Sequence, residues 1–291
     1  MSSPIDRVDA DIRKLMLDCG QEALEMSKVT FEVFEKDVND YVTSVDQTLD
    51  KKLSLAFEKW FPNDGIITEE NYSSRRCFHQ NHPRIWFIDP IDGTDDFIQR
   101  RSNYSIMVGL LTDYYPQAGW VYAPAHNYFV WGGPDWGLFA QYGEGDIGFL
   151  PVKPLKFGSL CPIMIGDKDK RRFGQAILSA FNEWFPQAST KAEFQSLGSF
   201  GLKVIEVIKG NAGLYVYLNG RVKLWDTTGP IALANAAGLV CCDLYGHSLR
   251  FDEAAINTET LAHQQAIIIG WPDYVEKLLP VIQQAVSNVL S

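Results

Sequence analysis

Residues 86–97 read Trp-Phe-Ile-Asp-Pro-Ile-Asp-Gly-Thr-Asp-Asp-Phe, which places four aspartates within eight positions. The apolar residues 85–88 predict a buried strand, and Gly93 with Thr94 predicts a turn into a helix. Carboxylates at a strand end can bind a hard cation such as Mg²⁺, and the free amides of a helix N-terminus can bind phosphate. The stretch therefore indicates phosphoryl-transfer chemistry.

The composition is that of an ordinary globular protein. The chain has 291 residues, 46% of them hydrophobic and 21% charged, enough for one large domain or two moderate ones. Its net charge of −10 argues against a surface that binds a nucleic acid polymer. We expect no membrane anchor and no secretory signal, because no apolar run is long enough and residues 1–7 lack the signal pattern. The five cysteines form no Cys-x-x-Cys pair, which favours free thiols and a cytoplasmic location.

The hydrophobic pattern changes character halfway along the chain. In the first half it predicts helices at 4–27 and 46–61, a strand at 66–68, and an antiparallel meander of four strands at 104–111, 118–122, 128–131 and 137–141. Residues 142–158 are rich in Gly and Pro and predict a boundary between subdomains 1–150 and 151–291. The second half alternates strand and helix, which predicts a layered α/β arrangement. Its expected strands are 162–166, 194–197, 214–218, 239–244 and 266–270, and its expected helices are 168–183, 200–209, 227–238 and 273–289.

Three acidic segments lie at predicted strand ends or helix starts: Glu69-Glu70, Asp89 with Asp92, and Asp226. Each has an ordinary explanation when it is taken alone. Asp226 fits a helix N-cap, Glu69-Glu70 fits a solvated turn, and Asp89 before a proline fits a turn initiator. The Asp-Pro-Ile-Asp-Gly-Thr string is harder to explain in this way, because Ile91 would face the core and leave its carbonyl free as a ligand.

Taken together, these segments resemble the inositol monophosphatase superfamily, whose members are Mg²⁺-dependent, lithium-sensitive phosphomonoesterases. The resemblance rests on Trp-Phe-Ile-Asp-Pro-Ile-Asp-Gly-Thr, the upstream Glu-Glu and the downstream Trp225-Asp226 before a helix. Residues 41–46 also resemble the segment whose aspartate orients the catalytic water. The similarity covers most of the chain and implies a layered αβαβα sandwich. It also implies a homodimer, with most metal ligands in residues 1–150 and Asp226 in residues 151–291.

The resemblance implies a role for each matching residue, with two or three Mg²⁺ ions per active site. The implied metal ligands are Glu69, Asp89, the Ile91 carbonyl, Asp92 and Asp226. The implied catalytic residues are Thr94 and Asp46, which would take a proton from the attacking water, and Glu70, which would support the ligands. The implied phosphate-binding groups are Asp92 and the amides of Gly93 and Thr94. Because no Ser, Cys or His nucleophile is required, we expect no covalent phosphoenzyme.

The substrate is less clearly indicated. Gly198, Ser199 and Lys203 resemble the family's substrate-side turn and helix. A lysine at this place is typical of members that hydrolyse 3′-phosphoadenosine 5′-phosphate, although a solvated helix residue would explain it equally well. The glutamate that binds inositol hydroxyls in inositol monophosphatases is absent, and Tyr217 or Asn219 falls at its place.

Nearby charges leave the substrate open. Arg221 or Lys223 could meet a second phosphate or be plain surface charge. Asp95 and Asp96 could disfavour highly charged substrates or simply complement the helix dipole. The leading candidates are inositol monophosphate and adenosine 3′,5′-bisphosphate, followed by sugar bisphosphates such as fructose 1,6-bisphosphate.

Two other functions compete with a phosphatase. The chain could be a metal-binding or regulatory protein that keeps the fold without turnover. It could also belong to another phosphoryl-transfer class, but it lacks the Gly-x-x-x-x-Gly-Lys-Ser/Thr loop and the kinase motifs. The predicted partner is therefore a small phosphorylated metabolite, with no nucleic acid and no membrane.

Overall fold

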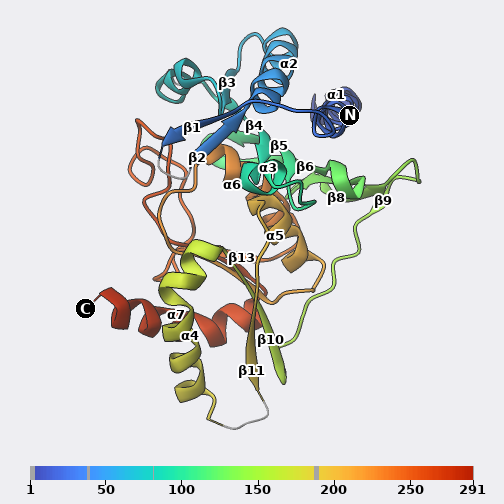
Figure 1. The fold of residues 1–291 in the computed structure, drawn as a ribbon. Helices are drawn as coiled ribbons and strands as arrows, with labels where there is room; N and C mark the ends of the chain where they lie inside the picture. The colour runs from blue at the N-terminus through green and yellow to red at the C-terminus, as the bar shows by residue number, and fades with distance from the viewer. Residues whose placement is uncertain (1–3, 38–39, 81, 187–189, 291) are drawn as a thin grey trace.

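The computed structural model describes residues 4–37, 40–80, 82–186 and 190–290. Helices and sheets alternate in five layers, in the order helix, sheet, helix, sheet, helix (Figure 1). The outermost layer contains α1 (Pro4–Met26) and α2 (Ser44–Trp60). The helices α5 (Phe200–Ile208) and α6 (Leu224–Ala236) lie between the sheets, and α4 (Asp167–Trp184) packs with α7 (Pro272–Leu290) on the far side. This arrangement confirms the expected αβαβα sandwich.

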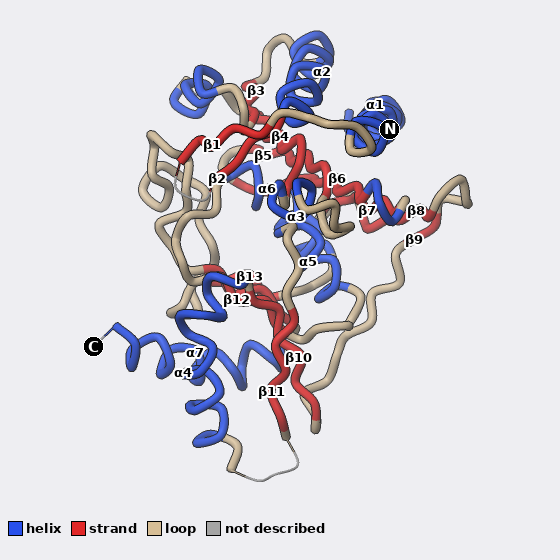
Figure 2. Tube along the Cα trace, viewed as in Figure 1, coloured by secondary structure: helices blue, strands red, loops and turns tan. Residues whose placement is uncertain are grey.

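The first sheet has seven strands, and only its first pair is parallel (Figure 2). Its order is β3 (Gly65–Thr68), β4 (Arg84–Asp92), β5 (Ser105–Thr112), β6 (Tyr115–Ala123), β7 (Tyr128–Gly133), β8 (Gly137–Tyr142) and β9 (Gly148–Phe149). The strands from β4 to β9 pair antiparallel with their neighbours, so the predicted meander is confirmed. The strand β9 falls inside the segment that we predicted as a linker.

The second sheet has five strands and mixed direction. Its order is β11 (Lys191–Gln195), β10 (Leu160–Ile165), β12 (Leu214–Tyr217), β14 (Ile267–Gly270) and β13 (Val240–Cys242). The strand β10 is parallel to both of its neighbours, whereas β14 is antiparallel to both of its own. The chain leaves β10 for β11 on one side and returns to β12 on the other, so loops after β10 and β12 meet at one edge of the sheet.

Three local expectations need correction. Asp89 and Asp92 do not lie in a loop after residue 88, because β4 continues to Asp92 through a bulge where its pairing with β5 shifts. Asp226 is not the N-cap of its helix but its third residue, since α6 begins at Leu224 and Asp226 accepts a hydrogen bond from the backbone of Lys223. The strand expected at 194–197 lies at 191–195.

Five short elements were not expected from the sequence: β9, a 3-10 helix at Pro124–His126, and the three that follow here. The strands β1 (Val33–Asp37) and β2 (Asp40–Thr43) pair antiparallel before α2, and a 3-10 helix spans Tyr72–His79. The short helix α3 (Thr94–Ile98) follows β4, as its sequence predicted. The division into subdomains at residue 150 stays a prediction, because one apolar core cluster includes residues from both halves of the chain.

Close contact between glycines sets the position of α6 against the first sheet. A Cβ atom added to Gly119 of β6 would lie 2.1 Å from the carbonyl oxygen of Gly229 in α6. A Cβ atom added to Gly109 of β5 would lie 2.4 Å from the backbone nitrogen of the same Gly229. The helix therefore approaches the sheet more closely than any side chain would permit. Asp226 lies one turn before this contact, so its position depends on it.

Two further predictions can be compared with the structure. All five cysteines are free, as expected. Among the residues that the structure describes, no helix combines the length and hydrophobicity needed to cross a bilayer.

Candidate metal centre and substrate cavity

Three carboxylates meet between the first sheet and α6. Asp89 and Asp92 lie on β4, and the bulge between them lets side chains three positions apart point to the same face, which a regular strand would not allow. Asp226 arrives from the first turn of α6. One oxygen of each carboxylate lies within 4.8 Å of the others. The structure therefore brings together three of the predicted metal ligands from segments far apart in the sequence.

Hydrogen bonds fix each carboxylate while leaving acceptor capacity free. Asp89 Oδ1 accepts from the backbone nitrogen of Ile91 at 3.0 Å, and Asp226 Oδ2 accepts from that of Lys223 at 2.7 Å. Asp89 Oδ2 is buried and has no hydrogen-bond partner. A buried carboxylate oxygen without a donor needs an explanation, and a bound divalent cation would supply one.

Burial and mutual repulsion both oppose ionisation of these acids. Burial, then the charges of Asp92 and Glu69, raises the pKa of Asp226 to about 8. Burial raises the pKa of Asp92 to about 6, opposed chiefly by Lys203. Burial, then the charges of Glu69, Asp92 and Asp226, raises the pKa of Asp89 well above its usual range. A cation among the three would relieve both penalties, so the residues fit a Mg²⁺ site.

The adjacent glutamates contact a lysine in this structure. Lys36 Nζ of β1 lies 2.8 Å from Glu69 Oε1 and 3.0 Å from Glu70 Oε1. Glu69 is not part of the three-acid group, although it lines the same cavity as Asp92 and Asp226. Burial, then Glu69, raises the pKa of Glu70 to about 8. The roles predicted for these two glutamates stay predictions.

The hydroxyl of Thr94 lies between Asp46, its predicted partner, and the carbonyl of Ile91, a predicted metal ligand. Its Oγ1 is 3.0 Å from the carbonyl oxygen of Ile91 and 3.5 Å from Asp46 Oδ1. Because a hydroxyl has one hydrogen, the shorter contact to Ile91 is the stronger one here. Asp46 is fixed by the capping box of α2, where its Oδ2 accepts from Thr43 N at 2.8 Å. Burial raises the pKa of Asp46 to about 6, which suits a proton acceptor near neutral pH.

Gly93 forms the turn between β4 and α3. Its φ of +94° lies in the left-handed region that favours glycine. A Cβ atom there would lie 3.0 Å from the carbonyl oxygen of Asn103 and 3.1 Å from the nitrogen of Ser199. The amides that follow, those of Thr94 and Asp95, are the first donors of α3 and have no acceptor within the helix. The geometry suits the phosphate-binding role implied for Gly93 and Thr94, and the role itself stays a prediction.

Ser199 joins the substrate side of the site to a metal ligand. It is the N-cap of α5, where its hydroxyl oxygen accepts from Leu202 N at 3.0 Å. The same hydroxyl donates to Asp92 Oδ2, which also accepts from the backbone of Gly201 at 3.0 Å. The sequence placed Ser199 on the substrate side and gave no sign of this contact, because the two residues come from different layers.

Lys203 is a buried residue of α5, which excludes the solvated helix position. It is 4% exposed, and its Nζ donates to the carbonyl oxygens of Leu197 and Gly198 at 2.9 Å each. Burial lowers the pKa of Lys203, while the charges of Asp92 and Asp226 act against this shift. Lys203 therefore holds the turn at Gly198 beside the acids. Contact with a substrate stays a prediction for both residues.

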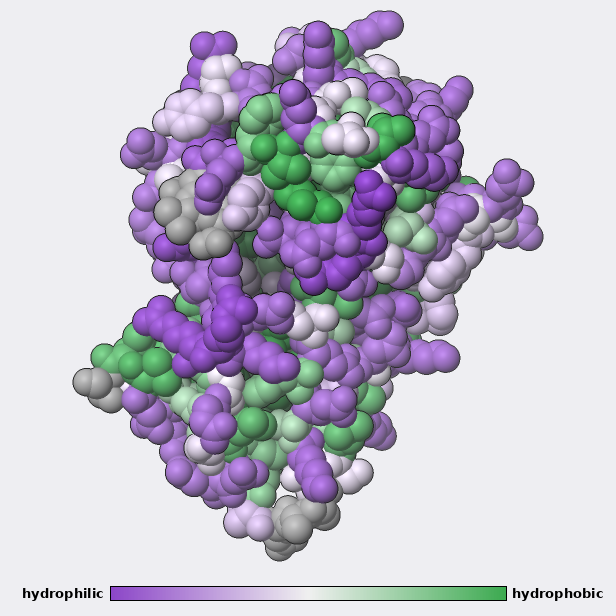
Figure 3. Space-filling model, viewed as in Figure 1, coloured by the Kyte–Doolittle hydropathy of each residue, from purple (hydrophilic) through white to green (hydrophobic). Residues whose placement is uncertain are grey.

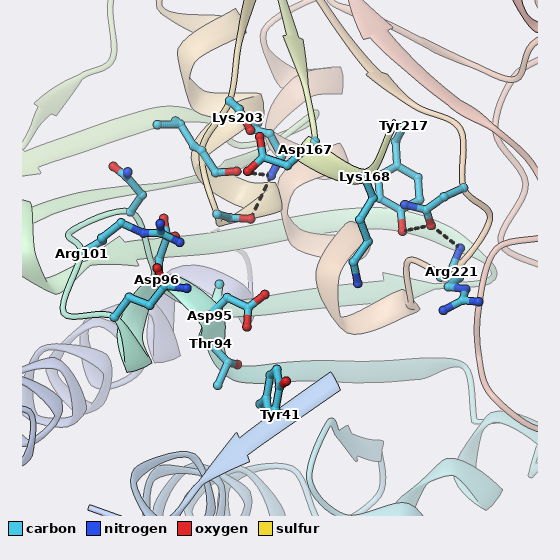
Figure 4. Close-up of a pocket in the computed structure, with 18 of the residues that line it drawn as sticks. Tyr41, Thr94, Asp95, Asp96, Arg101, Asp167, Lys168, Lys203, Tyr217 and Arg221 are labelled. Atoms are coloured by element: carbon cyan, nitrogen blue, oxygen red, sulfur yellow. Dashed lines mark hydrogen bonds and ion pairs between the residues drawn. The ribbon is translucent and has the colours of Figure 1, made fainter. Parts of the chain in front are cut away.

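A cavity of about 700 Å³ opens beside the Gly93 turn, and a second of about 640 Å³ adjoins it at the acids (Figure 4). Lys203, Tyr217 and Arg221 line both cavities, so the two cavities are neighbours. Tyr217 donates to Asn219 Oδ1 at 2.6 Å, so these two candidate substrate residues form a pair on the wall. In the space-filling view, hydrophilic residues dominate the surface around the junction of the two sheets (Figure 3).

The structure adds residues to the site that the sequence analysis left out. Lys168 and Arg171, from the first turns of α4, line the first cavity, and we had treated them only as part of a predicted helix. His263 lines the second cavity and is 1% exposed, with Nε2 at 2.9 Å from Thr227 Oγ1. None of these residues belongs to a recognisable motif, so only their proximity to the acids in the structure identifies them as part of the site.

The sequence matches the profile of the inositol monophosphatase family over residues 5–286. The Haemophilus influenzae 3′(2′),5′-bisphosphate nucleotidase CysQ is 26% identical over 235 residues, 81% of this chain and 82% of that protein. The Pasteurella multocida Nus factor SuhB is 25% identical over 270 residues, 87% of this chain and 86% of that protein. The Bacillus subtilis inositol-1-monophosphatase is 23% identical over 249 residues, 84% of this chain and 89% of that protein.

Solved structures show the same fold. The Thermotoga maritima IMPase superimposes with a TM-score of 0.76 at 22% identity, covering 98% of this chain and 99% of that one. An IMPase/NADP phosphatase complexed with Mg²⁺ and phosphate gives a TM-score of 0.74 at 18% identity, covering 95% of this chain and 94% of that one.

Proposed function

Because the chain belongs to the inositol monophosphatase family, we propose that it is a Mg²⁺-dependent phosphomonoesterase that releases phosphate from a small phosphorylated metabolite. The observation that carries this proposal is the meeting of Asp89, Asp92 and Asp226. Asp92 and Asp226 line a cavity that adjoins the cavity of the Gly93 turn. Acids that hold hard cations and a turn that holds an anion are the two parts that hydrolysis of a phosphomonoester needs.

The three aspartates would hold the cations, with Glu69 and the Ile91 carbonyl completing the set. Two or three bound Mg²⁺ ions would lower the pKa of the attacking water and stabilise the departing alcohol. The buried position of Asp89, with one oxygen lacking a donor, supports it as one of the ligands that would hold a cation. Glu70 would support these ligands through its neighbour Glu69.

The protein's own groups would position the substrate and accept the proton. Gly93 and Thr94 would donate their amides to phosphate oxygens, which the left-handed turn leaves free of helical bonds. Thr94 and Asp46 would accept the proton of the attacking water, and the pKa of Asp46, raised by burial, favours that role. Ser199 and Lys203 would fix Asp92 and the Gly198 turn, so that phosphate enters beside the acids.

The identity of the substrate is open between two leading classes. One relative is named as a bisphosphate nucleotidase and another as an inositol monophosphatase. A lysine at position 203 favours the nucleotide, and the lack of an acid at Tyr217 or Asn219 weakens the case for inositol. A sugar bisphosphatase of the fructose 1,6-bisphosphate type is the next alternative.

A non-catalytic role is the competing proposal. One relative is named a Nus factor, so a family member with a regulatory partner is a reasonable comparison. Homodimer formation, which the resemblance implied, would serve either role. The presence of every ligand-type residue, together with Thr94 and Asp46, favours turnover.

Phosphate release separates these proposals. The chain would be freed of metal with a chelator and assayed with and without added Mg²⁺ on inositol 1-phosphate, adenosine 3′,5′-bisphosphate and fructose 1,6-bisphosphate. We expect release from at least one of them only when Mg²⁺ is present. A correctly folded chain that releases no phosphate from any of the three would favour the non-catalytic role.

A further inference from the structure

One wall of the cavity carries three cationic side chains that the proposed reaction does not use. Lys168 and Arg171 come from the first turns of α4, and Arg221 follows β12. All three are exposed, and none forms an ion pair or side-chain hydrogen bond with another residue that the structure describes. Figure 4 shows Lys168 reaching into the space between Asp95 and Tyr217.

The topology of the second sheet explains why these residues meet. The strand β10 lies between β11 and β12 and is parallel to both. The chain passes from β10 to β11 on one side of it and then crosses to β12 on the other side. The loops after such strands enclose a crevice at their carboxyl ends, which is where open α/β sheets commonly bind ligands. Lys168 follows β10 and Arg221 follows β12, so they border this crevice from its two sides.

The charge in the cavity differs from that of the rest of the chain. The whole chain carries −10, yet the first cavity, the one beside the Gly93 turn, is lined by five cations and three acids. Arg101 is already paired with Asp96. The acids that remain, Asp95 and Asp167, are outnumbered by the three cations of the wall and the buried Lys203. Two of the donor positions of the Lys203 ammonium are taken by carbonyls, and the third has no acceptor among the described residues.

The three cations belong to α4 and to the chain after β12, whereas the proposed phosphate site belongs to the turn between β4 and α3. Lys168 and Arg221 line the cavity that contains the Gly93 turn as well as the one that contains the acids. A phosphate bound at that turn would therefore share its space with these cations, while Arg171 lines only the first cavity. The wall offers charge and forked donors to a second anionic group of the same molecule.

We propose that Lys168, Arg171 and Arg221 form a second anion subsite, so that the preferred substrate carries another phosphate besides the one removed. This inference rests on the proposed phosphatase function and deepens it. It favours bisphosphorylated metabolites over monophosphates, and it makes the three cations specificity residues rather than catalytic ones.

Matched substrates that differ by one phosphate test the subsite. Adenosine 3′,5′-bisphosphate and adenosine 3′-monophosphate carry the ester to be cleaved on the same hydroxyl group, as do fructose 1,6-bisphosphate and fructose 1-phosphate. We expect kcat/KM to favour the bisphosphate in at least one pair by about tenfold or more. Arg171→Gln and Arg221→Gln should each lower this preference through KM, with little change for the monophosphate. Lys170→Gln is the matched control, because Lys170 is an exposed cation of α4 that does not line the cavity.

A binding measurement separates failure of the subsite from failure of the proposed function. Calorimetry with adenosine 3′,5′-bisphosphate and its 3′-monophosphate, in the absence of divalent ions, reports binding without turnover. Tighter binding of the bisphosphate that Arg171→Gln removes would support the subsite even if no phosphate is ever released. Turnover with equal kcat/KM within both pairs, unchanged in the variants, would overturn the subsite and leave the phosphatase intact.

Discussion

The two sheets contribute opposite charges to the same cavity. The seven-stranded sheet, with α6 against it, supplies acids that are largely buried and held by backbone hydrogen bonds, as Asp89 and Asp92 illustrate. The five-stranded sheet supplies exposed cations from the loops beyond its parallel strands, as Lys168 and Arg221 illustrate. The difference separates two tasks, since fixed buried acids suit a reaction centre and exposed cations suit a choice among substrates.

The largest expected effect concerns the acidic side of this comparison. Replacing Asp92 by Asn keeps the size of the side chain and removes the charge that a cation needs. We expect Asp92→Asn to lower kcat by about a thousandfold or more, since turnover would depend on the cations held there. Phosphate release measures this, with circular dichroism and thermal unfolding as controls for folding. Near-normal turnover would remove Asp92 from the proposed ligand set.

A smaller loss is expected where the same sheet meets α2. The Thr94 hydroxyl lies within 3.5 Å of Asp46, so removing it would disturb proton transfer without touching a carboxylate ligand. We expect Thr94→Val to lower kcat by about a hundredfold while the Mg²⁺ concentration for half-maximal activity changes little. Thr94→Ser should recover most of the rate. A Val variant as active as the Ser variant would contradict the role of the hydroxyl.

The comparison of the acidic and cationic sides also shows which parts of the site could be predicted from the sequence. The candidate metal ligands on β4 could be predicted, because they are neighbours in the chain and their motif fits no simple turn. The bulge that turns Asp89 and Asp92 to one face could not be predicted from the sequence, because it depends on how β4 pairs with β5. Ser199 contacts Asp92 from a different layer of the fold, and Lys168 and Arg221 line the same cavity from segments far apart in the sequence. No local pattern predicts such contacts, whereas the helical and meander periodicities predicted most of the elements.

The next prediction tests the contact that joins α6 to the acidic sheet. A Cβ atom at Gly119 would lie 2.1 Å from the carbonyl oxygen of Gly229, so α6 would have to move. We expect Gly119→Ala to destabilise the chain by about 1–3 kcal/mol and to weaken Mg²⁺ activation, because Asp226 moves with the helix. Gly148→Ala is the control, since a Cβ atom there meets nothing within 4 Å. Equal unfolding midpoints in urea for both variants would show that the contact is not tight.

The smallest expected effect comes from His263, which contacts the first turn of α6 through Thr227. Thr227 Oγ1 donates to the carbonyl of Lys223 at 3.1 Å, so the imidazole Nε2–H donates to Thr227 and Nδ1 is left without a partner. Burial lowers the pKa of His263 to about 3. In the unfolded chain the imidazole of His263 binds a proton below about pH 6.5, whereas in the folded chain it stays neutral. The free energy of unfolding therefore decreases as the pH falls below about 6.5.

His263→Gln isolates this effect, because all other titrating groups are shared with the wild-type chain. We expect the wild-type chain to lose about 1.4 kcal/mol relative to the variant for each pH unit below about 6.5. Urea unfolding in the presence of a chelator, at several pH values between 7.5 and 5, measures the difference. Parallel stability curves for the two proteins would show that His263 protonates freely in the folded state.

The central claim is that Asp89, Asp92 and Asp226 share divalent cations beside the Gly93 turn. Anomalous scattering from crystals grown with Mn²⁺, as a substitute for Mg²⁺, tests it most directly. We predict at least two strong peaks within coordination distance of these carboxylates, with Asp89 contacting both. Crystals that bind Mn²⁺ elsewhere, or not at all, with the three carboxylates unchanged, would contradict the account.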